Sequence, residues 1–308
     1  MVVGDFSARD LARRLRRDGV TLHIGPFSVN LRSALPDVIS GAHLLYRDYR
    51  VSESPFADFH VSVETPAGLR RWLKPQVFFS LDGNRPFKPL PRPQALATLE
   101  WGLNWCISAH CHQYLILHAA VAEKNGLAVM FPARPGAGKS TLTAGLVSRG
   151  WRLFSDELAL LSLDEPGILT PVPRPINLKN ESIAVIREFA PQSTMGPVVA
   201  DTNKGTVAHM RAPVNSIERS SEPARPGFIV FPRFVGGSPT ILDPESKARS
   251  FMTMAQQSFN FHVLADTAFD ALHRTVSSCN CHELTYSNLD EAVYVLDELV
   301  ADREVAAG

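Results

Sequence analysis

Residues 132–141 read PARPGAGKST and lie between the apolar run LAVMF (127–131) and the helix-like stretch LTAGLVSRG (142–150). A loop that holds phosphate curls its backbone N–H groups around the anion, and the helix after it adds the positive end of its dipole. The glycines of this stretch permit such a curl, its lysine reaches the terminal phosphates, and the serine after the lysine ligates magnesium. We therefore predict a nucleotide-binding loop of consecutive residues, namely Pro135, Gly136, Ala137, Gly138, Lys139, Ser140 and Thr141.

The loop departs at one position from the pattern G-x-x-x-x-G-K-[ST], because Ala133 stands where the first glycine is usual. Alanine is tolerated at the end of a strand as long as its φ angle is negative. We therefore expect an ordinary strand end at Ala133 and a working phosphate loop. A chance match in an unrelated loop is the alternative.

The segment before the loop, YLILHAAVAEKNGLAVMFPA (114–133), contains two apolar runs joined by Asn-Gly at 125–126. This dipeptide is the strongest short-range signal for a two-residue type I′ hairpin. Counting outward from the turn places His118 opposite Ala133, which is beside the mouth of the phosphate loop. A histidine that only fills the core of the protein is the alternative for His118.

Two adjacent acids, Asp156 and Glu157, follow the helix after the loop, in the run WRLFSDELALLSL (151–163). The run is otherwise apolar and predicts one strand, so alternation would point the two carboxylates to opposite faces. Burying both is unfavourable unless a cation or hydrogen bonds compensate them. Magnesium with phosphates would compensate both. The alternative is an exposed edge strand, on which the two acids would be solvated and would have no functional role.

The motifs L-H-A-A-V, G-x-G-K-S-T and S-D-E, in this order, closely resemble the HPr kinase/phosphorylase family and its HPr-kinase-related relatives. The stretches PRPINLKNESI and DTNKGTVAH further resemble the HPr-kinase-related kinase A subgroup. The resemblance covers roughly residues 115–300. It implies an α/β fold with a P-loop kinase core of the HPr kinase and phosphoenolpyruvate carboxykinase type, and ATP and Mg²⁺ as cofactors.

Residue by residue, the resemblance assigns catalytic roles to Asp156, His118 and Lys139. Asp156 is the expected proton-transferring acid/base, His118 orients or tunes Asp156, and Lys139 binds ATP. Ser140 and Glu157 are the expected metal-binding residues, although Glu157 stands where the family usually has aspartate. The glycine- and asparagine-rich signature of true HPr kinases is not evident in this chain, so HPr as the substrate and phosphorolysis as an activity are left open.

The 308 residues divide by pattern into two expected domains. Residues 1–93 form a smaller strand-rich domain, with β-like runs at 20–31, 56–64 and 72–83, and they end in a proline-rich segment at 86–93. Residues 94–308 form the P-loop, HPr-kinase-like catalytic domain, which opens with a helix predicted for 94–112.

Composition excludes several functional classes. Lysine plus arginine and aspartate plus glutamate both number 31, so no net field attracts nucleic acid or an anionic membrane. No apolar run reaches about 18 residues, and no secretory signal is present at the N-terminus, so we expect a cytoplasmic protein. The four cysteines are expected to be reduced thiols. The cluster His110-Cys111-His112 lies in a helix-like stretch, where residues two apart point in different directions, and Cys279 with Cys281-His282 lacks the C-x-x-C spacing of a zinc site.

These observations predict an ATP-dependent kinase that transfers the γ-phosphoryl group to a hydroxyl, and the expected acceptor is a serine of a protein or peptide partner. Such transfer depends on positioning and charge neutralisation, and Arg174, Lys179 and Lys204 are candidate additional cations. Solvated surface charge is the alternative role for each of them. A small-molecule or modified-peptide kinase of a biosynthetic gene cluster and a non-catalytic ATP-binding regulator are the alternatives. HPr kinases form rings, so a homo-oligomer is a further option for this chain.

Overall fold

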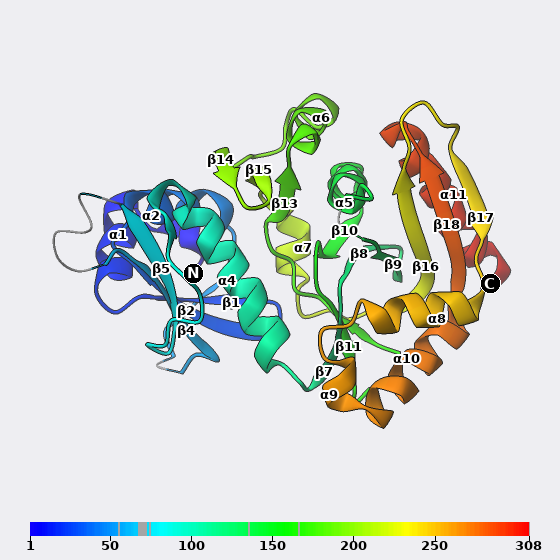
Figure 1. Cartoon of the computed structure of the whole chain (residues 1–308), viewed down its shortest axis with the longest axis horizontal. Helices are drawn as coiled ribbons and strands as arrows, with labels where there is room; N and C mark the ends of the chain where they lie inside the picture. Colours follow the sequence, from blue (N-terminus) through cyan, green and yellow to red (C-terminus); the bar gives the residue numbers. More distant parts are fainter. Residues whose placement is uncertain (55, 67–72, 74, 135, 166, 308) are drawn as a thin grey trace.

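The computed structural model describes residues 1–308 except 55, 67–72, 74, 135, 166 and 308. The side chains of 303–307 are also left out of the description. It is a mixed α/β protein with two lobes (Figure 1). The first lobe is built on a sheet with the order β3-β1-β2-β4-β5-β6. Its elements are α1 (Ala8–Arg16), β1 (Val20–Ile24), β2 (Phe27–Ser33), α2 (Pro36–Leu45), β3 (Val51–Ser52), β4 (Phe59–Glu64), β5 (Gln76–Leu81) and β6 (Leu90–Pro91).

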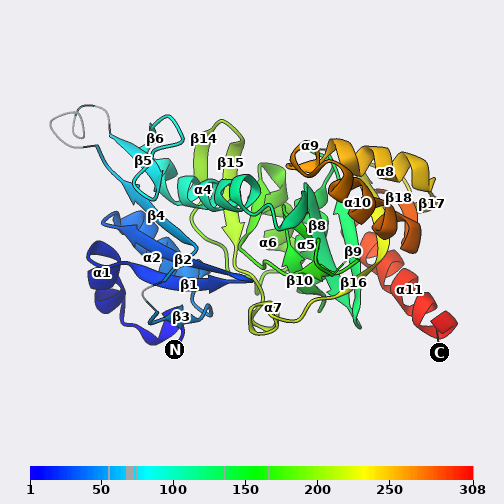
Figure 2. The ribbon, with the colours of Figure 1, turned by 90° about the horizontal axis from the view of Figure 1, so that it is seen from below.

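Helix α4 (Ala95–His110) joins the two lobes. It begins after the proline-rich segment, as the sequence predicts, and it packs against β4, β5 and α2 of the first lobe. Gly102 of α4 lies against the Phe79 ring of β5, where a Cβ atom would collide with that ring. One apolar core runs without interruption from the first lobe through α4 into the second. Figures 1 and 2 show α4 lying between the first sheet and the rest of the chain.

The shared core predicts that residues 94–308 do not fold alone. Without the first sheet, the buried side chains Leu96, Leu99 and Leu103 of α4 would face water. Exposed apolar surface of this kind promotes aggregation. We expect the fragment 94–308 to be insoluble or to bind the dye ANS strongly, whereas the full chain unfolds cooperatively. A soluble fragment with the melting temperature of the full chain would contradict this.

The second lobe is built on a sheet with the order β10-β8-β9-β16-β18-β17, in which β9, β16 and β18 are parallel. Along β9, Val129 and Phe131 face the apolar cluster that contains α5 (Lys139–Ser148) and α11 (Leu289–Ala307). Ala128 and Met130 face the cluster that contains α8 (Lys247–Gln256) and α10 (Asp266–Ser278). The sheet is therefore covered on both sides. Its strands are β8 (Ala119–Lys124), β9 (Leu127–Pro132), β10 (Arg152–Ser155), β16 (Arg225–Phe234), β17 (Ile241–Pro244) and β18 (Asn280–Tyr286).

Helices and two small sheets complete this lobe. The order in one small sheet is β12-β11-β7 and in the other β13-β15-β14. The remaining helices are α5 (Lys139–Ser148), α6 (Glu181–Phe189), α7 (Val214–Glu218), α8 (Lys247–Gln256), α9 (Phe261–Leu264), α10 (Asp266–Ser278) and α11 (Leu289–Ala307). The strands of the small sheets are β7 (Tyr114–Leu117), β11 (Ala159–Ser162), β12 (Leu169–Thr170), β13 (Ile176–Lys179), β14 (Val199–Thr202) and β15 (Gly205–Met210). Within the described part of the chain, no helix is long and apolar enough to cross a membrane.

The predicted hairpin is confirmed. Asn125 and Gly126 have φ angles of 54° and 84°, as a type I′ turn requires, and β8 pairs with β9 in the expected register. The ladder ends at the pair Ala119 and Pro132, so His118 and Ala133 lie one step beyond it. The backbone N–H of His118 instead donates to the carbonyl of Gln257, at 2.9 Å.

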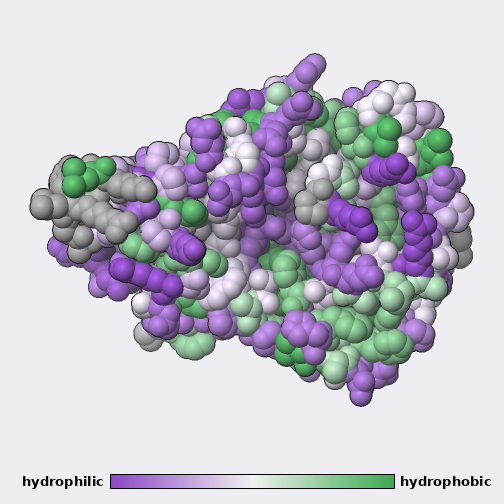
Figure 3. Space-filling view, viewed as in Figure 1, coloured by the Kyte–Doolittle hydropathy of each residue, from purple (hydrophilic) through white to green (hydrophobic). Residues whose placement is uncertain are grey.

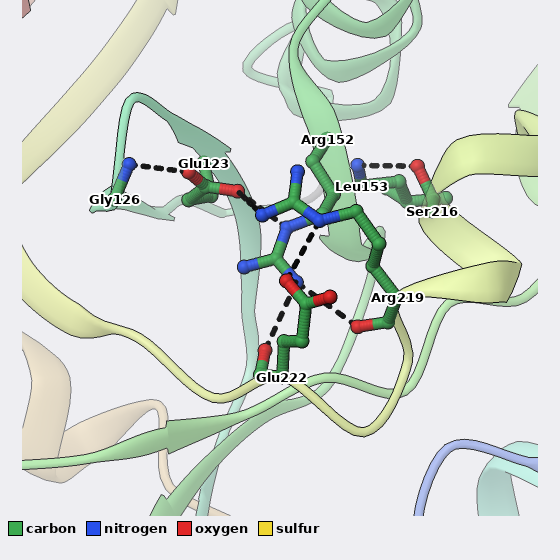
Figure 4. A network of polar contacts seen from close by, with 7 residues as sticks. All are labelled: Glu123, Gly126, Arg152, Leu153, Ser216, Arg219 and Glu222. Atoms are coloured by element: carbon green, nitrogen blue, oxygen red, sulfur yellow. Dashed lines mark hydrogen bonds and ion pairs between the residues drawn. The ribbon is translucent and has the colours of Figure 1, made fainter.

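A buried polar network fixes the hairpin to β10 and α7 (Figure 4). The Glu123 carboxylate accepts from the Arg152 guanidinium and from the Gly126 N–H, the latter at 2.6 Å. Arg152 also donates to the backbone carbonyls of Arg219 and Glu222, at 3.0 and 2.9 Å. The Arg152 and Glu123 side chains are 4% and 3% exposed, so this ion pair is closed to water. It holds the hairpin in register beside the strand that leads to the acids.

The prediction of one strand over 151–163 is wrong. The chain forms β10 and β11, which belong to different sheets. Between them the backbone bends, because the Ser155 hydroxyl accepts the N–H groups of Glu157 and Leu158, at 3.3 and 2.9 Å. Side-chain bonds of this kind compete with a strand ladder. Asp156 and Glu157 therefore lie on a turn, and both line one cavity rather than opposite faces of a strand.

Candidate functional site

The phosphate loop lies between β9 and α5, at the carboxyl end of the parallel strands. Gly136 and Gly138 have φ angles of 88° and 91°, a left-handed conformation that glycine adopts without strain. Strands β16 and β18 hold the loop from one side: the Phe234 N–H donates to the Ala137 carbonyl and the Tyr286 hydroxyl to the Gly138 carbonyl, each at 3.1 Å. Of the predicted loop residues, Pro135 lies outside those that the structure describes.

Gly138 is the most constrained glycine of the loop, and its replacement gives a sharp prediction. Alanine at either Gly136 or Gly138 would be left-handed, at a cost of about 1–2 kcal/mol. A Cβ atom at Gly138 would also collide with the Tyr286 hydroxyl, whereas one at Gly136 would meet nothing. We expect Gly138→Ala to lower the melting temperature more than Gly136→Ala, and Tyr286→Phe to restore part of the loss in Gly138→Ala. Equal losses in the two alanine variants would contradict the crowding.

Lys139 is the first residue of α5, and its ammonium group is buried in the site. Its Nζ has no hydrogen-bond partner among the described residues. Burial lowers the pKa of Lys139, and the nearby Asp156 and Glu157 carboxylates oppose this shift. A buried cation without a partner is unfavourable. Lys139 is therefore suited to bind an anionic ligand at the positive end of α5.

Asp156 is tied directly to the loop. One of its oxygens, Oδ2, accepts from the Ser140 hydroxyl at 3.2 Å and from the Asn177 N–H at 3.0 Å. The other, Oδ1, is buried and has no partner among the described residues. The side chain is 8% exposed. Burial raises the pKa of Asp156, while Lys139 lowers it. A cation at Ser140 would meet a carboxylate already bonded to its hydroxyl.

Glu157 lies more openly in the cavity, and different groups surround it. Its Oε2 accepts from the Asn104 side chain at 2.5 Å. Burial acts to raise the pKa of Glu157, but Lys204, Lys139 and His118 outweigh it, so the pKa is lowered. The carboxylate is therefore ionised at neutral pH.

His118 is neutral at pH 7, because burial and Lys139 lower its pKa to about 4. Among the carboxylates, Glu157 is the one that opposes this shift. The resemblance implies that His118 acts on Asp156, and in the structure His118 lines the same cavity as both acids. The hairpin register does bring His118 to the mouth of the loop, because it lines the same cavity as Ala133 and Lys139.

A cavity of about 760 Å³ opens over the loop, within the size range of ligand sites. It contains both acids, the loop and two of the three candidate cations, Lys179 and Lys204. The third, Arg174, is not in it and instead pairs with Glu100 at 2.8 Å. Figure 3 shows hydrophilic residues over the middle of this face, near α5, and apolar residues over α8, α9 and α10.

A second hollow, of about 930 Å³, lies over the exposed face of the first sheet. It contains none of the described residues of the phosphate loop and neither of the two acids. We place the functional site at the loop, because the unpaired buried charge and the adjacent carboxylates lie there.

Sequence reasoning missed several residues of the site. Asn104 comes from α4, Asn177 from β13, and Phe234 and Tyr286 from the ends of β16 and β18. None lies within a phosphate-loop motif, and each reaches the site only through the tertiary fold. The signal for Asn104 was weak, because the same helix also carries the polar residues Thr98, Glu100 and Ser108.

No protein-family model and no curated protein matches this chain. Among solved structures, it is similar to an HPr(Ser) kinase/phosphatase from Coxiella burnetii, with 13% sequence identity and a TM-score of 0.31. That alignment covers 63% of this chain and 99% of the other. A likeness of this size carries no argument about activity, which has to be inferred from the residues of the site.

Proposed function

We propose that this chain is a magnesium- and ATP-dependent phosphotransferase that moves the γ-phosphoryl group to a hydroxyl, specifically a serine of a protein or peptide. The observation that carries the proposal is the buried ammonium of Lys139 at the start of α5, which has no hydrogen-bond partner among the described residues and lies in a cavity with two carboxylates. A terminal phosphate would satisfy this ammonium, and the left-handed glycines before it suit a backbone that curls around an anion.

The residues present also fit a magnesium ion. Ser140 and Asp156 would hold it, because the serine of a phosphate loop and an aspartate are the usual metal ligands in this class of site. Their side chains are already in contact, and Asp156 has a buried oxygen without a partner among the described residues. When bound, magnesium neutralises charge on the phosphate oxygens.

Glu157 is then the group that accepts the proton of the attacking hydroxyl. It is more exposed than Asp156, it lines the large cavity, and its Oε1 makes no side-chain hydrogen bond with a described residue. The carboxylate is ionised at neutral pH and lines the cavity in which an acceptor would bind, so it can take up a proton there. This exchanges the roles that the resemblance implies, in which Asp156 accepts the proton and Glu157 binds the metal. His118 is neutral at pH 7 and lines the same cavity as Glu157, where it tunes the charge of that carboxylate.

The proposal is tested first by binding and then by transfer. Magnesium-ATP is expected to raise the melting temperature, and ATP with EDTA to raise it less. Incubation with γ-labelled ATP and a lysate of the source cells is then expected to place label on a protein or peptide at serine. Binding without acceptor-dependent consumption of ATP would favour a regulatory switch, and label on a small molecule would assign a different acceptor class.

A further inference from the structure

A chain of polar side chains links Glu157 to the first lobe. The Asn104 amide donates to Glu157 at 2.5 Å and accepts from an Arg174 nitrogen at 2.6 Å. Arg174 also donates to the Glu100 carboxylate at 2.8 Å, and the Tyr46 hydroxyl donates to the same carboxylate at 2.7 Å. Tyr46 follows α2 in the first lobe, so the chain connects the two lobes through α4.

These hydrogen-bonded side chains fix the orientation of the Asn104 amide. Its carbonyl oxygen must face the guanidinium and its NH₂ group must face the carboxylate, because the reverse would oppose two donors and two acceptors. Both bonds join the amide to a charged group, and such bonds are stronger than neutral ones. Glu100 is 1% and Arg174 7% exposed, so water cannot replace their bonds.

The support behind Asn104 is also stiff. Arg174 stands between Pro173 and Pro175, whose rings fix the backbone φ angle. The Tyr49 hydroxyl donates to the Pro173 carbonyl at 3.0 Å, and the Tyr49 ring packs on that of Tyr46 at 4.7 Å. Both tyrosines are fully buried. The first lobe thus holds the segment that positions the guanidinium.

Glu157 needs such a support because the cavity offers it other partners. Lys139 and Lys204 line the same cavity, and the Lys204 ammonium lies 5.1 Å from the centre of the Trp101 ring, on the helix that carries Asn104. A glutamate that lost its bond to Asn104 could turn to an ammonium instead. We propose, on the basis of the proposed function, that Asn104 is a positioning residue for Glu157, and that Arg174, Glu100 and Tyr46 make the first lobe part of the reaction machinery.

The test uses two substitutions of Asn104 in the full chain. Asn104→Ala removes both bonds, while Asn104→Asp keeps an acceptor for Arg174 and places an oxygen against Glu157. We expect Asn104→Asp to be the more stable variant and the less active one. If Asn104 only stabilised the fold, the more stable of the two variants would also be the more active one.

Activity is measured as phosphate release from magnesium-ATP, with water as the acceptor. Asn104→Ala is expected to lower kcat by about 10- to 100-fold, the effect of a misplaced group, with the dissociation constant for magnesium-ATP within about twofold of the wild type. Ser108→Ala is the matched control, because Ser108 lies one turn further along α4 and, among the residues that the structure describes, its hydroxyl bonds only to the Trp105 carbonyl. It is expected to keep wild-type turnover.

A double variant decides whether Asn104 acts through Glu157. Asn104→Ala in the Glu157→Gln background is expected to lose no further activity, since the two residues act as one unit. If the double variant loses activity by the product of the two single losses, the positioning role is overturned. A loss of magnesium-ATP binding in Asn104→Ala that parallels its loss of activity would overturn it as well. A wild-type protein that neither binds nor consumes magnesium-ATP would overturn the proposed function itself. Normal binding with wild-type turnover in Asn104→Ala would overturn the positioning role alone.

Discussion

Lys139→Met is expected to remove the stabilisation of this protein by magnesium-ATP while leaving the ligand-free protein at least as stable as the wild type. The wild type should gain about 2.7 kcal/mol at a ligand concentration one hundred times the dissociation constant. The variant should gain little, because it lacks the buried ammonium for which the described part of the chain provides no hydrogen-bond partner. Methionine keeps the length of the side chain and removes its charge.

The ligand-free arm of this prediction follows from the pKa of Lys139. Burial lowers that pKa below the value of the unfolded chain, so the charged form is disfavoured in the folded protein at neutral pH. The contribution of Lys139 to the free energy of unfolding is therefore most favourable above the unfolded pKa of about 10.5. This contribution is lost as the pH falls through the lowered pKa of the folded protein. Replacing a charge that opposes folding should not destabilise the protein.

Thermal unfolding with and without magnesium-ATP measures both arms. Lys124→Met is the matched control, because Lys124 pairs with Asp297 at 2.6 Å on the hairpin, outside the cavity. It is expected to keep the full shift in melting temperature. A full shift in Lys139→Met would remove the nucleotide-site assignment. A marked loss of ligand-free stability would mean that Lys139 serves the fold through Asp156 and Glu157.

The parts of the site that could be predicted from the sequence depend on local backbone chemistry. Asn125 and Gly126 adopt left-handed angles in most sequence contexts, so the turn, the register and the position of His118 follow from counting. Gly136 and Gly138 likewise carry their conformations with them. These features need no knowledge of what packs around them.

The turn at the acids could not be predicted because it depends on a competition. Residues 151–163 are as apolar as those of a continuous strand, and such a strand tolerates a serine at position 155. Only the folded chain shows that its hydroxyl captures two N–H groups and that β10 and β11 join different sheets. The same limit applies to Asn104 and Arg174, which meet from distant segments without any spacing signal.

The largest expected effect on turnover belongs to the acid that accepts the proton. Glu157→Gln keeps the shape of the side chain and its bond to Asn104 but removes basicity. It is expected to lower kcat by about 10²- to 10⁴-fold, the usual range for a lost general base, and to leave the affinity for magnesium-ATP nearly unchanged. Asp156→Asn is expected to act on the metal instead, so that a higher magnesium concentration is needed for half-maximal stabilisation by ATP.

The two variants together decide between the two assignments of the acids. Asp156 contacts the Ser140 hydroxyl, whereas Glu157 and His118 act on each other's pKa values. If the proposed roles are right, only Asp156→Asn changes the magnesium dependence, and His118→Gln adds no loss to Glu157→Gln. The opposite pattern, with normal magnesium dependence and strongly reduced turnover in Asp156→Asn, would restore the roles that the resemblance implies. In either case the metal-binding acid and the proton-accepting acid are separated by one peptide bond, and the turn at Ser155 is what allows both to face the same cavity.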